Sequence, residues 1–363
     1  MPTWTQPDWT TWSDEEPPTV DLSVYLQATE EELCDILSIR EGMTAPLYQM
    51  MQYHLGWLDT RLVPEEAPRG KRLRPLLCLL ACEATGGDWR RALGAAAAVE
   101  LVHNFSLLHD DIEDNSALRR HRATVWSLWG IAQGINAGDG MWAVARLAVH
   151  RLSRAGCGPA QVLWVARLLD HACLELCTGQ FLDISFEERE SVSLAEYERM
   201  IAGKTAALLA AALAMGAVLG GSHEQAVGAY HAFGYELGLT FQIRDDILGI
   251  WGDPARTGKS AASDILARKK TLPALYALQW ERDHGYTDLA RIYARPRLVP
   301  EHVPEVLGLL ERAGALEFAR DQVREHHRRT EISLVAAVAG ASGPLSAQDR
   351  LSELAFSLVD RAF

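Results

Sequence analysis

The chain has 363 residues, of which 48% are hydrophobic, so it is long and apolar enough to bury a large core. Its formal net charge of −13 disfavours nucleic acid as a partner, and six cysteines are too few for a disulfide scaffold in a chain of this size. No segment has the order of a secretory signal. The longest uncharged run, residues 205–225 apart from Glu224, is rich in Ala and Gly, which is typical of a buried helix. We therefore expect a cytoplasmic protein without a transmembrane segment.

Residues 1–20 are predicted to form a flexible tail. Trp4, Trp9 and Trp12 stand there among Pro, Thr, Asp and Glu, without the period of a helix or a strand. Such a segment is either a disordered leader or a docking segment for another protein, since exposed tryptophans are unfavourable unless they bury against something. The sequence leaves both interpretations open.

From residue 29 onward the sequence predicts one helix after another and almost no strand. Apolar residues recur at helical spacing, and two capping boxes, Thr29 with Glu32 and Ser193 with Glu196, mark expected helix starts. We expect a single all-α domain over residues 21–363, a bundle of roughly ten or more helices. The clearest helices are expected at residues 74–84, 93–114, 161–188, 200–219 and 226–250, then a loop at 252–258, a helix near Pro273 and two or three amphipathic helices over 304–363.

Four carboxylates lie within five residues at the end of the second of these helices. Asp110 and Asp114 are one turn apart on one face, with Asp111 beside them. Like charges at this spacing destabilise a helix, so a cation should compensate them. Oxygen ligands of this kind suit Mg2+, which keeps several waters and binds a few carboxylates together with substrate phosphates. The alternative is a solvated acidic surface.

A second acidic pair, Asp245 and Asp246, lies on another long helix, and Gln242 precedes it by about one turn on the same side. Aspartates on two buried helices are unfavourable without a ligand. If the two acidic faces meet, they would hold metal ions between them and clamp a polyphosphate.

Cations occur near both acidic segments. Lys71 and Arg74 stand at the start of an apolar helix, which is a ready anion site, and Arg is suited to bidentate phosphate binding. A lone lysine is usually a solvated charge and a lone histidine usually a core residue, so the pattern matters more than each member. The other candidates are Arg119 and Arg120 after the first run, His103 two turns before it, Lys204 with Thr205 in an apolar helix, and Lys259 and Lys269 after the second pair.

At this point the sequence resembles the trans-prenyltransferase family, the polyprenyl diphosphate synthases, and especially the short-chain geranylgeranyl and farnesyl diphosphate synthases. The resemblance extends from about Gly70 to Pro273, with five motifs in the family's order. These are GKRLRP at 70–75, HNFSLLHDDIEDNSALRR at 103–120, GQFLDISFE at 179–187, Gly203-Lys204-Thr205, and FQIRDDILGIWGD at 241–253 with Lys259 and Lys269.

The resemblance implies a homodimeric helical bundle of the isoprenoid synthase type around a central cavity, and a Mg2+-dependent condensation of isopentenyl diphosphate with an allylic diphosphate. Two or three Mg2+ ions would be held by Asp110, Asp111, Asp114, Asp245 and Asp246, with Arg119, Lys204 and Lys259 helping to bind the allylic diphosphate. Isopentenyl diphosphate would bind Lys71, Arg74, His103 and Arg120. Thr205 and Gln242 would lie near the allylic carbocation, and Lys269 is also expected to contact substrate.

Two positions depart from the family pattern, and three bear on product length. Gly249 replaces the third carboxylate of the second motif, and Asp253 is the candidate to take over its role. His121 stands where the family often has Gly, and we expect little effect from this change. Product length is expected to depend on Phe105 and Ser106, five and four residues before Asp110, with a lesser contribution from Val102 at eight, whose plainer interpretation is core packing. The resemblance favours a C20 product, geranylgeranyl diphosphate, over C15 farnesyl diphosphate.

Two other functions fit the same fold. A non-catalytic partner subunit of a prenyl synthase need not retain both acidic motifs, yet this chain retains nearly all of them. A terpene cyclase uses one diphosphate substrate and has no need of a second site at Lys71, Arg74 and His103. Both features favour a two-substrate synthase.

Overall fold

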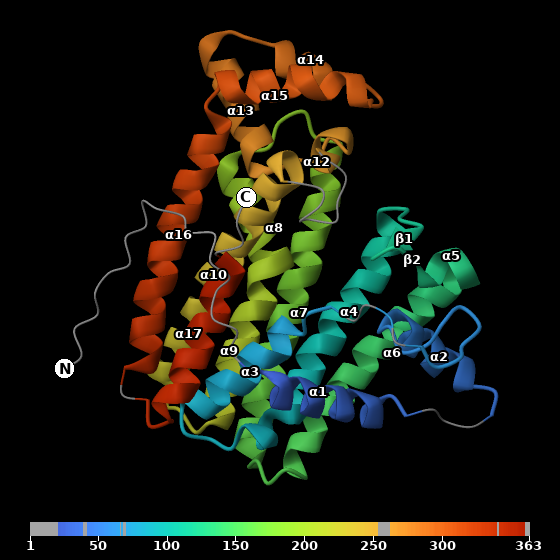
Figure 1. Ribbon diagram of the computed structural model, residues 1–363, viewed down its shortest axis with the longest axis vertical. Coiled ribbons are helices and arrows are strands. Elements are labelled where there is room, and N and C mark those ends of the chain that lie inside the picture. The colour runs from blue at the N-terminus through green and yellow to red at the C-terminus, as the bar shows by residue number, and fades with distance from the viewer. Residues whose placement is uncertain are drawn as a thin grey trace.

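The computed structural model describes residues 21–38, 42–65, 67, 70–252, 262–339 and 341–359 (Figure 1). The predicted tail at 1–20 and the predicted roles of Asp253 and Lys259 lie outside the described residues. Within these ranges the protein is all-α, as predicted, and its strands are a single two-residue pair.

The helices follow the predicted order closely. Their bounds are α1 Ser23–Ile36, α2 Ala45–His54, α3 Leu73–Ala84, α4 Leu93–Glu113, α5 Val125–Trp129, α6 Ile131–His150, α7 Pro159–Glu187, α8 Leu194–Ile201, α9 Ala207–Leu219, α10 Glu224–Trp251, α12 Ser263–Leu266, α13 Leu272–His284, α14 Asp288–Tyr293, α15 Val303–Arg312, α16 Ala315–Val338 and α17 Leu345–Val359. A π-helical segment, Ala202–Ala206, joins α8 to α9, and short 3-10 turns occupy Trp89–Ala92, Arg151–Ser153 and Pro300–His302.

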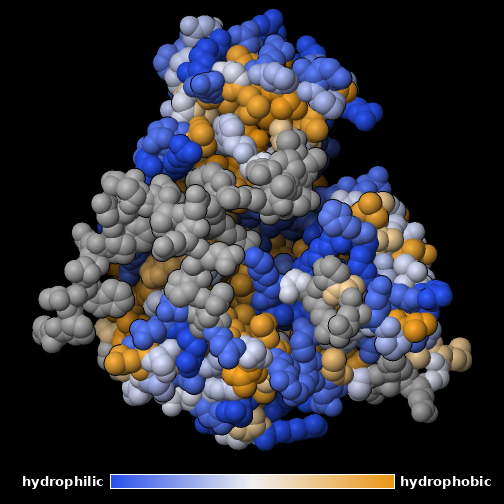
Figure 2. All heavy atoms as spheres, in the orientation of Figure 1, coloured by the Kyte–Doolittle hydropathy of each residue, from blue (hydrophilic) through white to orange (hydrophobic). Residues whose placement is uncertain are grey.

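The long helices α7, α9 and α10 run side by side through the middle of the molecule (Figure 1). α16 lies along α10, α4 packs on α6, and α3 packs on α9. The segment α13–α15 forms a separate upper part in the view of Figure 1 and has its own apolar cluster. On this face the upper part shows a patch of hydrophobic side chains, and hydrophilic and hydrophobic side chains are mixed over the rest of the coloured surface (Figure 2).

The most apolar helical segment is part of the core. Leu194–Leu219 is long and apolar enough to cross a membrane, but 94% of its most apolar window is buried inside the protein. Every residue of α9 from Leu208 to Leu219 is buried, against α3, α7 and α10. Burial all round the helix explains why its sequence shows no polar face. This agrees with the expectation of a buried helix.

One of the two predicted capping boxes is confirmed. Ser193 accepts a hydrogen bond from the Glu196 amide, and the Glu196 carboxylate accepts one from the Ser193 amide, at the start of α8. The prediction at Thr29 was wrong, because α1 already begins at Ser23 and Thr29 is buried inside it. The Thr29 hydroxyl donates to the Tyr25 carbonyl one turn earlier, a common alternative partner for a threonine within a helix.

The small hairpin after α4 was not predicted. β1 (Leu118–Arg119) pairs with β2 (Arg122–Ala123) in antiparallel register, and the two residues between them have positive φ, 51° at Arg120 and 62° at His121. Two-residue hairpin turns prefer this left-handed geometry, which favours glycine. The geometry explains why glycine suits position 121, and His121 carries a strained backbone there that the sequence did not indicate.

Candidate active site

The first acidic face is the C-terminal end of α4. Asp110 and Asp111 lie in its last turn and Asp114 caps it. The β1–β2 hairpin turns Arg119 back onto this end, where its Nε donates to Asp111 Oδ1 at 2.6 Å and its Nη2 to Asp110 Oδ2 at 2.7 Å. The second oxygen of Asp111, Oδ2, is buried and accepts no hydrogen bond from the residues that the structure describes. The run is therefore a partly buried cluster compensated by a cation rather than a solvated surface.

Close backbone contact between α7 and the π-helical segment places Lys204 at this face. A Cβ atom on Gly179 would lie 2.1 Å from the Lys204 amide nitrogen, and one on Gly203 would lie 2.5 Å from the Glu175 carbonyl oxygen. Only glycines allow the two backbones to touch, and π-helical turns are frequent at functional sites. Gly179 and Gly203 thus explain how this lysine reaches the acidic run from a distant segment.

Lys204 joins the acidic run to α7. Its Nζ donates to Asp183 Oδ2 at 2.5 Å and to Asp110 Oδ1 at 3.3 Å. On the same helix, Gln180 donates to Glu113 at 2.7 Å and to Asp110 at 3.3 Å. No role was predicted for Gln180 or Asp183, which lie within the motif at 179–187. Their i, i+3 spacing near the end of a long helix was the available signal, and the structure places both in the site.

The second acidic face adjoins the first through Thr205, the neighbour of Lys204. Thr205 donates its hydroxyl hydrogen to Gln242 Oε1 at 2.7 Å, and Gln242 Nε2 donates to Asp246 Oδ1 at 3.0 Å. Asp246 Oδ2 accepts from the Tyr197 hydroxyl at 2.6 Å and from the Leu272 amide at 3.0 Å. Both Asp246 oxygens are thus engaged by the protein, whereas Asp245 stands half-buried beside it on α10. The two predicted acidic faces thus each have their own hydrogen bonds, and the neighbouring residues Lys204 and Thr205 place these two sets next to each other.

Burial makes the negative charges in this network unfavourable. It raises the pKa of Asp246 to about 6, although Lys269 and three hydrogen bonds act against the shift. Partial burial also raises the pKa of Asp111 to about 6, against the opposing effect of Arg119, and the pKa of Asp114 to about 6, with further repulsion from Asp110. Carboxylates in such a setting gain most from an added cation.

At Lys204 and Lys269, nearby carboxylates outweigh burial and favour the charged form. Burial alone would lower the pKa of Lys204, but the carboxylates of Asp183 and Asp110 outweigh it and raise that pKa above its usual value. At Lys269 burial is likewise overcome, and Asp246 is the strongest of the carboxylates that raise its pKa. Both lysines are therefore held as cations between the acidic groups.

The donor set fits Mg2+. All candidate ligands are carboxylate oxygens, and the buried Asp111 Oδ2 has unused acceptor capacity. Within the described residues, no three acidic, His or Cys side chains surround a single metal position. Arg119 and Lys204 contact oxygens of Asp110 and Asp111.

A cluster of cations lies beside α4, about two turns before the acidic run. Burial lowers the pKa of His103 well below its usual value, and Arg74, Arg120, Arg119 and His54 lower it further. Burial and the same arginine-rich surroundings lower the pKa of His54, at the end of α2, to about 3. Both histidines are thus neutral hydrogen-bonding groups amid positive charge. His54 was not predicted, because nothing in the sequence of α2 connects it to the other motifs.

The other cations of this cluster lie where the sequence suggested. Arg74 is in the first turn of α3, its Nε is buried and it makes no hydrogen bond to the described residues. Lys71 is exposed just before that helix. Burial lowers the pKa of Arg120, and Arg72 contributes to the same direction. Positive charges that repel one another in the free protein form an electrostatic site for an anion.

Arg72, between Lys71 and Arg74 in sequence, has a different role. It adopts a left-handed backbone at the N-cap of α3, and its side chain is 2% exposed. It donates to Glu30 at 2.6 Å and to Glu100 at 2.8 Å, so it ties α1, α3 and α4 together. Its charge is thus satisfied inside the protein rather than offered to an anion.

The three residues predicted to set product length lie on α4 below the acidic run. Val102 is fully buried and Phe105 is 8% exposed. The Phe105 ring is edge-on to His109, with 5.7 Å between ring centroids. Ser106 is half-buried and donates its hydroxyl hydrogen to the His103 carbonyl at 2.8 Å. The bulk on this part of α4 therefore comes from Phe105, and Ser106 leaves space beside it.

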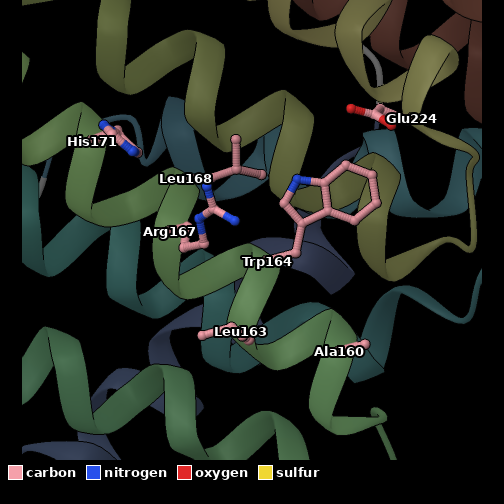
Figure 3. Close-up of a pocket in the computed structure, with 7 residues that line it drawn as sticks. All are labelled: Ala160, Leu163, Trp164, Arg167, Leu168, His171 and Glu224. Atoms are coloured by element: carbon pink, nitrogen blue, oxygen red, sulfur yellow. The ribbon is translucent and has the colours of Figure 1, made fainter.

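One surface pocket lies away from these groups. It has a volume of about 460 Å³ and is lined by the N-terminal half of α7, including Trp164 and Arg167, with Glu224 at the start of α10 (Figure 3). Asp183 lies on the same helix, roughly 28 Å from Trp164 at a helix rise of about 1.5 Å per residue. The polar network at the acidic faces, not this pocket, contains the groups suited to diphosphate chemistry.

Comparison with known proteins agrees with this geometry. The family model for polyprenyl synthetase matches residues 59–310. The chain is 42% identical over 281 residues to a geranylgeranyl diphosphate synthase of Mycobacterium tuberculosis, covering 77% of this chain and 79% of that protein. It is 39% identical over 319 residues to a (2E,6E)-farnesyl diphosphate synthase of Mycobacterium bovis, covering 86% and 85%.

A solved structure agrees as well. The crystal structure of a polyprenyl synthetase from Streptomyces coelicolor superposes with a TM-score of 0.81 at 36% identity, covering 93% of this chain and 98% of that one. The family match spans more than half of the chain and includes both acidic faces and the cation cluster. The chain therefore belongs to the polyprenyl synthetase family, and it is a prenyltransferase of the short-chain prenyl diphosphate synthase type.

Proposed function

We propose that this protein condenses isopentenyl diphosphate with an allylic diphosphate in a Mg2+-dependent reaction and releases an all-trans geranylgeranyl diphosphate. The observation that carries the proposal is the placement of two distinct polar sites on α4. One is acidic and bridged by Lys204, and the other is a cluster of cations around His103. A terpene cyclase, with one diphosphate substrate, would not need the second site, and a non-catalytic subunit would need neither.

The acidic site would bind the allylic diphosphate. Asp110, Asp111 and Asp114 would hold Mg2+ from one side and Asp245 from the other, while the bonds seen at Asp246 keep the second face in place. Bound Mg2+ supplies Lewis-acid stabilisation of the negative charge that develops on the departing diphosphate. Arg119 and Lys204 would add fixed positive charge at the same oxygens, which favours cleavage of the carbon–oxygen bond.

Thr205 and Gln242 would serve the carbocation formed by that cleavage. Thr205 donates its hydroxyl hydrogen to Gln242, so its oxygen keeps its lone pairs available to the adjacent space. Oxygen dipoles that are already oriented stabilise developing charge without reorganising during the reaction. These two side chains also connect the acidic site to Asp246, so the position of the cation is coupled to the second acidic face.

The cation cluster would bind isopentenyl diphosphate. Arg74, Arg120 and Lys71 would neutralise its diphosphate, and the neutral His103 would donate a hydrogen bond without adding charge. Lys269, and Lys259 from outside the described residues, would complete the allylic diphosphate contacts. Holding both substrates beside one helix makes the coupling step effectively intramolecular. The departing diphosphate, held at the acidic site, would accept the proton lost in the final step.

Incubation with isopentenyl diphosphate, Mg2+ and each allylic starter in turn tests the proposal. Chromatography of the dephosphorylated products should show a C20 alcohol, and chelation of divalent metal should abolish its formation. Product from a single diphosphate without isopentenyl diphosphate would indicate a cyclase instead. Absence of turnover with every starter would reject the synthase function.

Phe105→Ala is expected to lengthen the product. Phe105 is the bulky residue on α4 five positions before Asp110, and removing its ring opens space where the chain would extend. The variant should shift a substantial fraction of product beyond C20 in the same chromatographic assay. Phe356→Ala serves as the matched control, because it removes the same ring from a half-buried position of α17, on which no predicted site residue lies. An unchanged product from Phe105→Ala would refute the role of this residue.

We also propose that the protein is a homodimer formed through α6 and α7. Leu163, Leu174 and Phe181 are 63%, 63% and 68% exposed and lie on one stripe of α7, while Ile135 and Trp142 are exposed on α6. Adjacent exposed apolar faces of this kind mark an interaction surface.

Leu174→Glu should therefore halve the mass measured by sedimentation equilibrium. Leu345→Glu is the matched control, because Leu345 is 75% exposed on α17, far from this stripe in sequence, and the variant should keep the wild-type mass. Equal masses for both variants would place the dimer contact elsewhere or show a monomer.

A further inference from the structure

The second acidic face lacks a carboxylate at its third position. Asp245 and Asp246 are followed by Gly249, which lies three to four residues further along α10 and hence on the same side of the helix. A third aspartate at this position would extend the face by one turn. Gly249 itself is buried and contributes no side chain.

The space above Gly249 is filled by a carboxylate from another helix. A Cβ atom built on Gly249 would lie 2.0 Å from Asp264 Oδ2 and 2.5 Å from Asp264 Cγ. Real Cβ atoms do not approach other atoms this closely, so no larger residue fits position 249 while Asp264 stays in place. The carboxyl carbon of an aspartate at 249 would itself lie about one bond length, roughly 1.5 Å, from that Cβ. Asp264 therefore places its carboxylate close to where the missing group would be.

The chain holds Asp264 in this position from a segment that returns to α10. Asp264 lies in the first turn of α12, which begins after the left-handed residue Ala262 and packs on α10. The Lys269 amide donates to the Asp264 carbonyl at 2.9 Å, which closes a tight loop between the two residues. The loop brings the Lys269 ammonium group into the field of Asp246, Asp264, Asp183 and Asp245 together. Asp264 thus belongs to the same electrostatic group as the second acidic pair and Asp183.

We propose that Asp264 supplies the third carboxylate of the second metal-binding face, from α12 instead of α10, and that Gly249 is the residue that leaves room for it. The inference rests on the proposed Mg2+-dependent function. The role is to contribute a carboxylate oxygen toward the divalent ion on the Asp245 side of the diphosphate.

The test compares variants that remove the Asp264 carboxylate with a double variant that places a carboxylate at position 249 of α10. Thermal unfolding is followed as Mg2+ is titrated into the protein with a fixed concentration of inorganic pyrophosphate, and the Mg2+ concentration that gives half of the stabilisation is recorded. Asp264→Asn keeps the shape of the side chain and Asp264→Ala removes it; both should need at least about 10-fold more Mg2+ than the wild type. The double variant D264A/G249D should return to within about 3-fold of the wild type, because the new carboxylate enters the vacated space.

Two further variants complete the test. G249D alone should lower the unfolding midpoint without Mg2+, since its side chain collides with Asp264. Asp283→Asn, the same change at an exposed position of α13, should match the wild type throughout.

The inference is overturned if Asp264→Asn has the wild-type Mg2+ requirement, or if D264A/G249D folds normally but still behaves like D264A. Should the double variant fail to fold, the result with Asp264→Asn decides. A wild-type protein that makes no product and shows no Mg2+-dependent stabilisation by pyrophosphate would instead reject the proposed function.

Discussion

Replacing Asp110 with asparagine is expected to reduce turnover by about 1000-fold, equivalent to roughly 4 kcal/mol of transition-state stabilisation. Asp110 accepts hydrogen bonds from Arg119, Lys204 and Gln180, so it is the carboxylate shared by most elements of the site. The amide keeps the size of the side chain but loses the charge that would hold Mg2+. Steady-state kinetics with isopentenyl diphosphate and an allylic starter measure the effect.

The loss at Asp110 must be separated from a loss of fold. Circular dichroism of Asp110→Asn should match the wild type, because the helix end keeps its length and its other carboxylates. Asp283→Asn makes the same chemical change on an exposed part of α13 and should leave kcat unchanged. If Asp110→Asn retained near-normal activity, Asp110 would have to be removed from the metal site.

Arg120→Gln is expected to raise the KM for isopentenyl diphosphate between about 10-fold and about 100-fold, the effect of losing one charge-assisted hydrogen bond to a phosphate. Its kcat at saturating substrate should change much less. The unfolding midpoint should not fall, because burial and neighbouring arginines already disfavour this charge in the free protein. A binding loss without a stability loss is the expected result for a residue whose natural partner is a ligand.

Arg72→Gln provides the contrast within the same segment. Its guanidinium is buried between Glu30 and Glu100, so removing it leaves the buried Glu100 and the partly buried Glu30 without their cation. Breaking such a pair costs about 3 kcal/mol or more of unfolding free energy. Arg72→Gln should therefore lower the unfolding midpoint clearly, whereas an exposed control, Arg154→Gln, should change neither quantity. A stability loss in Arg120→Gln equal to that in Arg72→Gln would contradict the assignment of Arg120 to substrate.

Local sequence signals predicted most of the helices, but not every start. The predicted helix at 93–114 is observed as Leu93–Glu113 and the one at 226–250 as Glu224–Trp251, because long apolar periodicity depends on each helix alone. The capping pattern at Thr29 failed because the same hydroxyl also bonds the preceding turn when the helix begins earlier. The hairpin carrying Arg119 was missed since two-residue strands have no periodicity to read.

The sequence by itself determined the helical class, the two acidic motifs and the family, because these depend on residues close together in the chain. Only the tertiary structure decided which charges face one another. It brought Asp183 and Gln180 to Asp110, separated the ion-paired Arg72 from Arg120 in the cation cluster, and filled the space at Gly249 with Asp264. These pairings join segments far apart in sequence, and they exist only where helix packing makes two backbones meet, as at Gly179 and Gly203.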